Sequence, residues 1–118
     1  MTVVVAVPDS AEGALALEAA VAEAKLLDTN LVAVNLGRGA LDTSAYEDVT
    51  VMNLSPVSDQ VDGVLAAISQ HDASRLVIGI KRRTPVGKAL LGSISQHLLL
   101  QSPIPVLSVK LPEDEEED

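Results

Sequence analysis

The chain has 118 residues, a length typical of one domain with one core. It has no cysteine, which excludes disulfides and thiolate metal sites and is typical of a reducing compartment. Tyr46 is the one aromatic residue, so the chain lacks the stacking platform that recognition of single-stranded nucleic acid needs. The net charge is −9, and residues 113–118 (EDEEED) are all acidic. We therefore expect a domain over residues 1–111 and a disordered acidic tail over residues 112–118.

The apolar segments of the chain are short. None approaches the roughly 20 residues that cross a membrane, and the first ten residues lack the basic start of a signal peptide. The acidic balance also disfavours nucleic acid. We expect a cytoplasmic protein without a membrane or nucleic-acid partner.

The first part of the chain predicts a strand, a helix and a second strand. Residues 2–8 form a β-branched run that is apolar on both faces, which is typical of a buried strand. The Ala- and Leu-rich residues 10–30 predict a helix with Asp9 or Ser10 as its N-cap. Residues 31–36 predict the second strand. Four apolar residues at helical spacing are expected on one face of the helix: Leu15, Ala19, Ala22 and Leu26.

The middle of the chain predicts one strand and one helix. Residues 37–48 are turn-like and too short for a helix with its two loops, so we expect a loop there. Residues 49–54 predict the third strand. Residues 55–72 predict a helix that begins near Ser58 and has three apolar residues on one face. These are Val61, Leu65 and Ile68.

The last part of the chain predicts a strand, a helix and a closing strand. Residues 75–80 and 104–110 are the apolar runs. Between them, residues 93–102 predict a helix, and Ser93 with Gln96 has the spacing of a capping box. Strands that alternate with helices along the whole chain indicate a parallel sheet with helices on both faces.

Open parallel sheets bind ligands beyond the carboxyl ends of their strands. Residues 79–93 (GIKRRTPVGKALLGS) follow such an end and lead into a helix. Gly92 permits close backbone approach, the Ser93 hydroxyl can donate to a phosphate oxygen, and the helix N-terminus favours an anion. Four basic residues add positive charge: Lys81, Arg82, Arg83 and Lys88. The stretch is a candidate phosphate loop, and a solvated turn is the alternative.

Other sites of chemistry are not evident. Residues 79–93 do not match the Walker A pattern, and Gly37 and Gly39 lack the third glycine of the dinucleotide pattern. His71 and His97 have no acidic partner at metal-ligand spacing, and no general base is positioned for hydrolysis. We expect no metal site, no catalytic residue and at most weak nucleotide hydrolysis.

The spacing of Gly79, position 82 and Gly92-Ser93 resembles the G-x2-G-x9-G-[ST] motif of the universal stress protein family. Residues 102–110 (SPIPVLSVK) are similar to the closing segment of that family, and the first strand with its Ala-rich helix resembles the opening. The resemblance covers residues 2–110. It implies a Rossmann-like fold of the adenine nucleotide alpha hydrolase type, an open five-stranded parallel sheet in the order 3-2-1-4-5. The helix between strands two and three would be reduced to a loop.

The resemblance also implies a regulatory protein that binds ATP, AMP or a cyclic nucleotide, with Mg²⁺ possible beside ATP. Gly79 and Gly92 would contact the ribose and phosphates, and Ser93 with the Ile94 amide would cap the phosphates. Ile78 and Leu36 would line the adenine and ribose region. The alternative is a stress or scaffold dimer that binds no nucleotide and acts through protein–protein contacts.

The sequence departs from the family pattern at two motif positions. Arg82 stands where the family has its middle glycine, and it would either crowd the phosphates or bind them through its guanidinium. Pro8 stands where the family has an aspartate, and Asp9 or Ser10 is the candidate substitute.

The last strand is the candidate dimer interface. An apolar strand at the edge of a sheet invites pairing, and the family resemblance implies a homodimer joined there. The expected interface residues are Ile104, Val106, Leu107, Ser108 and Val109.

Overall fold

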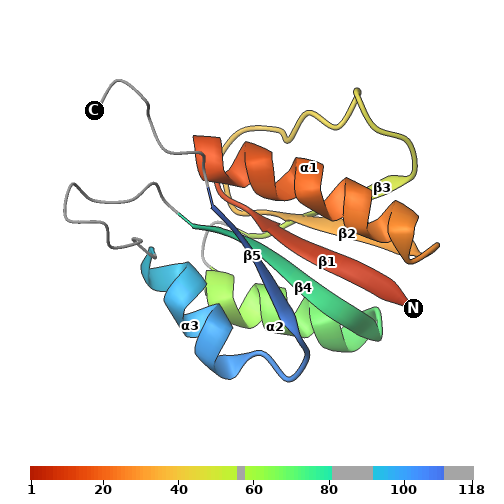
Figure 1. Cartoon of the computed structure of the whole chain (residues 1–118). Coiled ribbons are helices and arrows are strands. Elements are labelled where there is room, and N and C mark those ends of the chain that lie inside the picture. The colour runs from red at the N-terminus through yellow and green to blue at the C-terminus, as the bar shows by residue number, and fades with distance from the viewer. Residues whose placement is uncertain (56–57, 81–91, 111–118) are drawn as a thin grey trace, which may run out of the picture.

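The computed structural model describes residues 1–55, 58–80 and 92–110. The expected acidic tail at residues 112–118 and the basic residues 81–83 and 88 lie outside these ranges. Strands and helices alternate along the described chain except between β2 and β3, which follow each other (Figure 1). In chain order they are β1 (Thr2–Val7), α1 (Ala11–Leu26), β2 (Asn30–Asn35), β3 (Val49–Asn53), α2 (Gln60–Gln70), β4 (Ala73–Ile80), α3 (Ser93–Gln101) and β5 (Val106–Lys110).

The five strands of the described chain form one parallel sheet in the order β3-β2-β1-β4-β5, which confirms the predicted fold class. From β1 the chain moves outward to β2 and β3, then returns to the other side of β1 for β4 and β5. The strand order therefore reverses between β1 and β4. All carboxyl ends meet at one edge of the sheet, which is where ligands bind in this architecture.

The sheet has a hydrophobic core on each face. Side chains of successive strand residues point to opposite faces, so Val3, Val5 and Val7 face α1 while Val4 and Ala6 face α2 and α3. All six residues of β1 are buried. This explains why the strands are apolar without alternation, as expected for a sheet covered on both sides (Figure 1).

Helix α1 presents a different face to the sheet from the one predicted. Leu15 and Ala19 are only half-buried, Ala22 is exposed, and Leu26 is 79% exposed. The physical reason is close packing, because a Cβ at Gly13 would lie 2.0 Å from the carbonyl oxygen of Pro8. Small residues dominate the face that meets the sheet: Gly13, Ala16, Leu17, Ala20, Val21 and Ala24.

The helix N-termini agree with the sequence prediction at α1 and α2 but not at α3. Ser10 caps α1, and its hydroxyl oxygen accepts a hydrogen bond from the Gly13 N–H at 3.3 Å. Helix α2 begins two residues after Ser58 and is capped by Asp59. The predicted capping box at α3 is wrong, because Gly92 occupies the N-cap position without a side-chain bond and Ser93 is already helical.

The connection between β2 and β3 contains no helix, as predicted. Instead, Asn35 at the end of β2 organises the loop. Its amide nitrogen donates to the Gly39 carbonyl at 2.8 Å and to the Asn53 side chain at 2.9 Å, while its oxygen accepts from the Gly37 N–H at 2.9 Å. Leu41 and Tyr46 pack onto the core beneath α1. The loop is thus fixed at both β2 and the helix-facing core.

No helix within the described ranges is long and apolar enough to cross a membrane.

Candidate functional site

A pocket of about 220 Å³ lies at the carboxyl edge of the sheet, beside the point where the strand order reverses. We call it the α3 pocket. It brings together four residues that the sequence predicted to bind a nucleotide, from the end of β2 and the start of α3. These four are Leu36, Gly92, Ser93 and Ile94. The other lining residues are Ala6, Pro8, Glu12 and Ser95.

The start of α3 lines the α3 pocket. The first amides of an α-helix have no acceptor within the helix, and here the N-cap Gly92 supplies no side-chain acceptor. The first intrahelical bond runs from the Gln96 N–H to the Gly92 carbonyl at 2.9 Å. The amides of Ser93, Ile94 and Ser95 precede it. Together with the helix dipole, these N–H groups favour a bound anion.

Gly79 has a packing role beside the site, whereas its position in the motif had predicted contact with a ligand. It is buried, and a Cβ there would lie 2.3 Å from the Glu12 carbonyl oxygen in the first turn of α1. Its own carbonyl accepts a hydrogen bond from the Ser95 hydroxyl at 3.4 Å. Gly79 therefore lets α1 approach β4 and links β4 to the first turn of α3. It does not line the α3 pocket.

Ile78 is not among the described residues that line the α3 pocket. Its side chain is 1% exposed and belongs to the core between the sheet and the helices α2 and α3. Such a side chain offers a ligand almost no surface.

Glu12 is a residue of the α3 pocket that sequence reasoning missed. It is half-buried in the first turn of α1, directly beyond the end of β1. Its position in the sequence could have predicted this, because Glu12 lies in the first turn of the helix that follows the first strand, next to the point where the strand order reverses. It brings a carboxylate to a pocket whose other described lining residues are uncharged.

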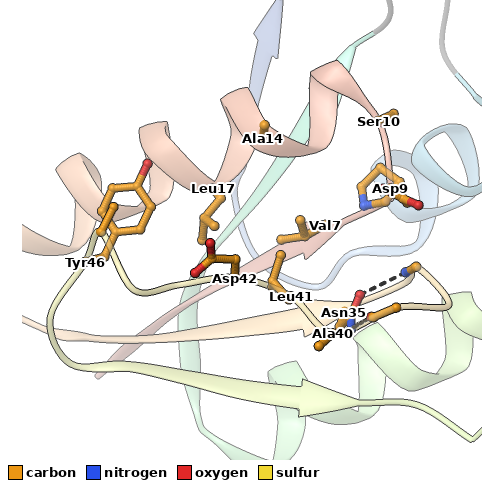
Figure 2. Close-up of a pocket in the computed structure, with 14 residues that line it drawn as sticks. Val7, Asp9, Ser10, Ala14, Leu17, Asn35, Ala40, Leu41, Asp42 and Tyr46 are labelled. Atoms are coloured by element: carbon orange, nitrogen blue, oxygen red, sulfur yellow. Dashed lines mark hydrogen bonds between the residues drawn. The ribbon is translucent and has the colours of Figure 1, made fainter.

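Asp9 and Ser10 line a different pocket, on the α1 face of the sheet. This α1 pocket has a volume of about 380 Å³ and lies between α1, the end of β1 and the loop at residues 36–48 (Figure 2). The Ser10 hydroxyl already caps α1. Pro8, where the family pattern has its aspartate, lines both pockets.

A third pocket, of about 640 Å³, lies beyond the carboxyl ends of β2 and β3. It shares Leu36 with the α3 pocket and includes Arg38 and Gln60. The Gln60 side-chain amide donates to the Leu36 carbonyl at 2.9 Å, which ties the start of α2 to the end of β2. The two pockets thus meet at Leu36.

Arg82, the substituted motif position, lies outside the described residues. Within the described ranges, no group of three or more His, Asp or Glu side chains could hold a metal ion.

Strand β5 lies at one edge of the described sheet, paired with β4. Its side chains are half-buried apart from exposed Lys110, and they contribute to both cores. Val106 and the preceding Ile104 pack on the α2–α3 side, while Leu107 and Val109 pack on the α1 side.

The strand order and the helices on both faces of the sheet define a Rossmann-like α/β domain. The model of the universal stress protein family matches residues 40–110. A universal stress protein of Mycolicibacterium smegmatis is 40% identical over 119 residues, covering 83% of this chain and 88% of that protein. This chain belongs to the universal stress protein family.

Solved structures show the same fold. A universal stress protein from Archaeoglobus fulgidus superposes with a TM-score of 0.72 at 26% identity, covering 93% of this chain and 98% of that one. A universal stress protein in complex with cAMP gives a TM-score of 0.67 at 22% identity, covering 92% and 95%. One from Archaeoglobus fulgidus in complex with dAMP gives 0.66 at 22% identity, covering 93% and 98%.

Proposed function

We propose that this universal stress protein is a regulatory protein that binds an adenine nucleotide in the α3 pocket. The observation that carries the proposal is the meeting of Leu36 with the uncapped start of α3, Gly92 to Ile94, in one cavity at the strand reversal. Two structures of the same fold, which hold cAMP and dAMP, support the adenine class.

In the proposed complex, the phosphate lies at the start of α3. The amides of Ser93 and Ile94 donate to its oxygens, as does the Ser93 hydroxyl, and the helix dipole adds to the attraction. Gly92 has φ −64° and ψ 160°, a backbone conformation that any residue can adopt. Glycine is therefore important at this position because it has no side chain. Backbone without a Cβ lets the phosphate approach the amides directly.

The base and ribose then lie toward Pro8 and Leu36. The α3 pocket, at about 220 Å³, is small for a whole nucleotide, since ligand pockets are commonly about 300–1,000 Å³. The adjoining pocket of about 640 Å³ provides the additional room across Leu36. Its wall carries Gln60, whose side chain is held by the Leu36 carbonyl.

The charge of Glu12 bears on which nucleotide binds. A carboxylate beside the phosphate disfavours additional negative charge unless a cation accompanies it. Mg²⁺ prefers oxygen ligands and would enter with ATP, with Glu12 as the carboxylate that lines the α3 pocket. A monophosphate such as AMP or cAMP needs no such partner.

Isothermal titration calorimetry with AMP, cAMP and ATP, the last with and without Mg²⁺, tests the proposal. We expect Gly92→Val to abolish binding, because its side chain would occupy the phosphate position. Ser93→Ala should lower affinity about 10- to 100-fold, the effect of one lost hydrogen bond to a charged group. Ser69→Ala, on the exposed face of α2, is the control and should bind as the parent does.

Failure of all three nucleotides to bind below millimolar concentration would contradict the proposal. Mass spectrometry of small molecules released from freshly purified protein gives an independent reading. If the purified protein is a dimer but releases no nucleotide, the result would favour the alternative of a scaffold that acts through protein–protein contacts.

The proposed assembly is a homodimer in which β5 meets its mate around a two-fold axis. The edge position of β5 and its half-buried apolar side chains support this arrangement.

A further inference from the structure

The α1 pocket is distinct from the α3 pocket. It opens on the α1 face of the sheet. Among the described residues, it shares Pro8 with the α3 pocket, and it shares Asn35 and Gly37 with the adjoining pocket of about 640 Å³. Its volume of about 380 Å³ lies in the range of small-molecule sites. It exists because the connection from β2 to β3 is a loop, which stands off from α1 where a helix would pack.

The walls of the α1 pocket are held in place before any ligand arrives. Asn35, which is 7% exposed, fixes the loop through its hydrogen bonds to Gly37, Gly39 and Asn53. Leu41 and Tyr46 anchor the far side of the loop on the core beneath α1. A preformed cavity of this kind does not require the loop to be ordered upon binding, which lowers the cost of association.

The α1 pocket has an apolar floor and an acidic residue at each end. Val7 and Leu17 are buried floor residues, and Leu41 closes the loop side. In the view of Figure 2, Asp42 lies toward one end with Tyr46, Asp9 lies toward the other end, and Val7 and Leu41 lie between them. Within residues 1–55, 58–80 and 92–110, no Lys or Arg lines the pocket.

Both carboxylates are available to a ligand. Within the described ranges, neither Asp9 nor Asp42 forms an ion pair. Hydrogen bonds from Ser44, first from its side chain and then from its backbone N–H, hold the pKa of Asp42 below its ordinary value. Asp42 is therefore charged at neutral pH, and its Oδ1 is the atom engaged by the Ser44 N–H at 2.9 Å.

From the acid at each end and the apolar floor between them, we propose that the α1 pocket binds an aliphatic diamine. The methylene chain would lie over Val7 and Leu41. One ammonium would face Asp9, and the other would face Asp42 and the ring of Tyr46, where a cation–π contact adds to the charge pairing. The proposal does not depend on nucleotide binding in the α3 pocket.

Two-dimensional NMR of the full-length protein, titrated with 1,5-diaminopentane, tests this inference. A residue-specific measurement is needed because the acidic residues 113–118 attract any cation. We expect saturable shifts of the Leu41, Asp42 and Tyr46 amides. Pentylamine should cause the same shifts with about fivefold lower affinity, since one exposed ion pair is lost. The uncharged 1,5-pentanediol should cause none.

Two variants with matched controls sharpen the test. Asp42→Asn keeps the oxygen that accepts from Ser44 and should weaken binding about fivefold, whereas Glu18→Gln, an exposed acid of α1 outside the pocket, should not. Ala14→Leu fills the pocket from an exposed helix position and should abolish the shifts, whereas Ala22→Leu should leave them.

The inference is overturned if the saturable shifts are absent from the loop, if they survive Ala14→Leu, or if Asp42→Asn binds the diamine as tightly as the parent. Equal shifts with pentanediol would also overturn it, because the acids would then contribute nothing.

Discussion

Gly79 shows how one motif residue can serve the fold and the site together. Its missing side chain admits the first turn of α1, and its carbonyl holds the first turn of α3. The sequence motif predicted contact with a ligand, whereas the geometry explains the glycine by contact between elements. A motif position therefore does not by itself separate the two roles.

Gly79→Ala should destabilise the protein by about 1–3 kcal/mol, because its methyl group would overlap backbone that cannot move independently. Urea unfolding measures the change. Gly39→Ala is the control, since nothing lies within 4 Å of a Cβ at that position. Equal midpoints for the two variants would contradict the packing role of Gly79.

The sequence allows two opposite roles for Arg82, which would either bind the phosphates of a nucleotide or crowd them. We propose that its guanidinium contacts the phosphate of the nucleotide, because the position belongs to the family's phosphate motif. Arg82→Gly, which restores the family residue, should then lower nucleotide affinity about tenfold in calorimetry, the effect of a lost charge-assisted bond. A rise in affinity would instead mean that the arginine crowds the site.

At the scale of elements, the two errors of sequence prediction have different causes. Helix α1 is so rich in alanine that the spacing of its leucines suggested a face, yet Gly13 and Ala16 determine the contact by their small size. At α3, the side chain of Ser93 suggested a cap, but the backbone enters the helix one residue earlier, at Gly92. Hydrophobic spacing carries no information about how closely two backbones pack.

Strand β5 is the element on which the proposed dimer depends. Val106→Lys should give a monomer in light scattering, because an isologous contact would bring the new charge close to its own copy. Ser108→Asp adds a charge without removing an apolar contact with the core, and it should have the same effect. Circular dichroism should show both variants folded. A persistent dimer would exclude this interface.

At the scale of the whole molecule, much of the architecture was predictable from sequence. Five apolar runs, most of them separated by helical segments, indicated the parallel class, and the family resemblance supplied the strand order. The α3 pocket was predictable in part, because the resemblance had assigned Leu36 and Gly92 to Ile94 to the nucleotide site. Glu12 and the α1 pocket were not, since both arise from how α1 and the loop at residues 36–48 sit on the sheet.

The missing crossover helix also divides the sheet into parts of unequal local stability. Strand β3 pairs only with β2, and its burial is partial, whereas β1 is buried throughout and pairs on both sides. In amide hydrogen exchange, the amides of β3 should therefore show a lower opening free energy than those of β1, because β3 opens as a separate unit before global unfolding. If both strands exchanged together at the free energy of global unfolding, the loop at residues 36–48 would be protecting the sheet as well as a helix does.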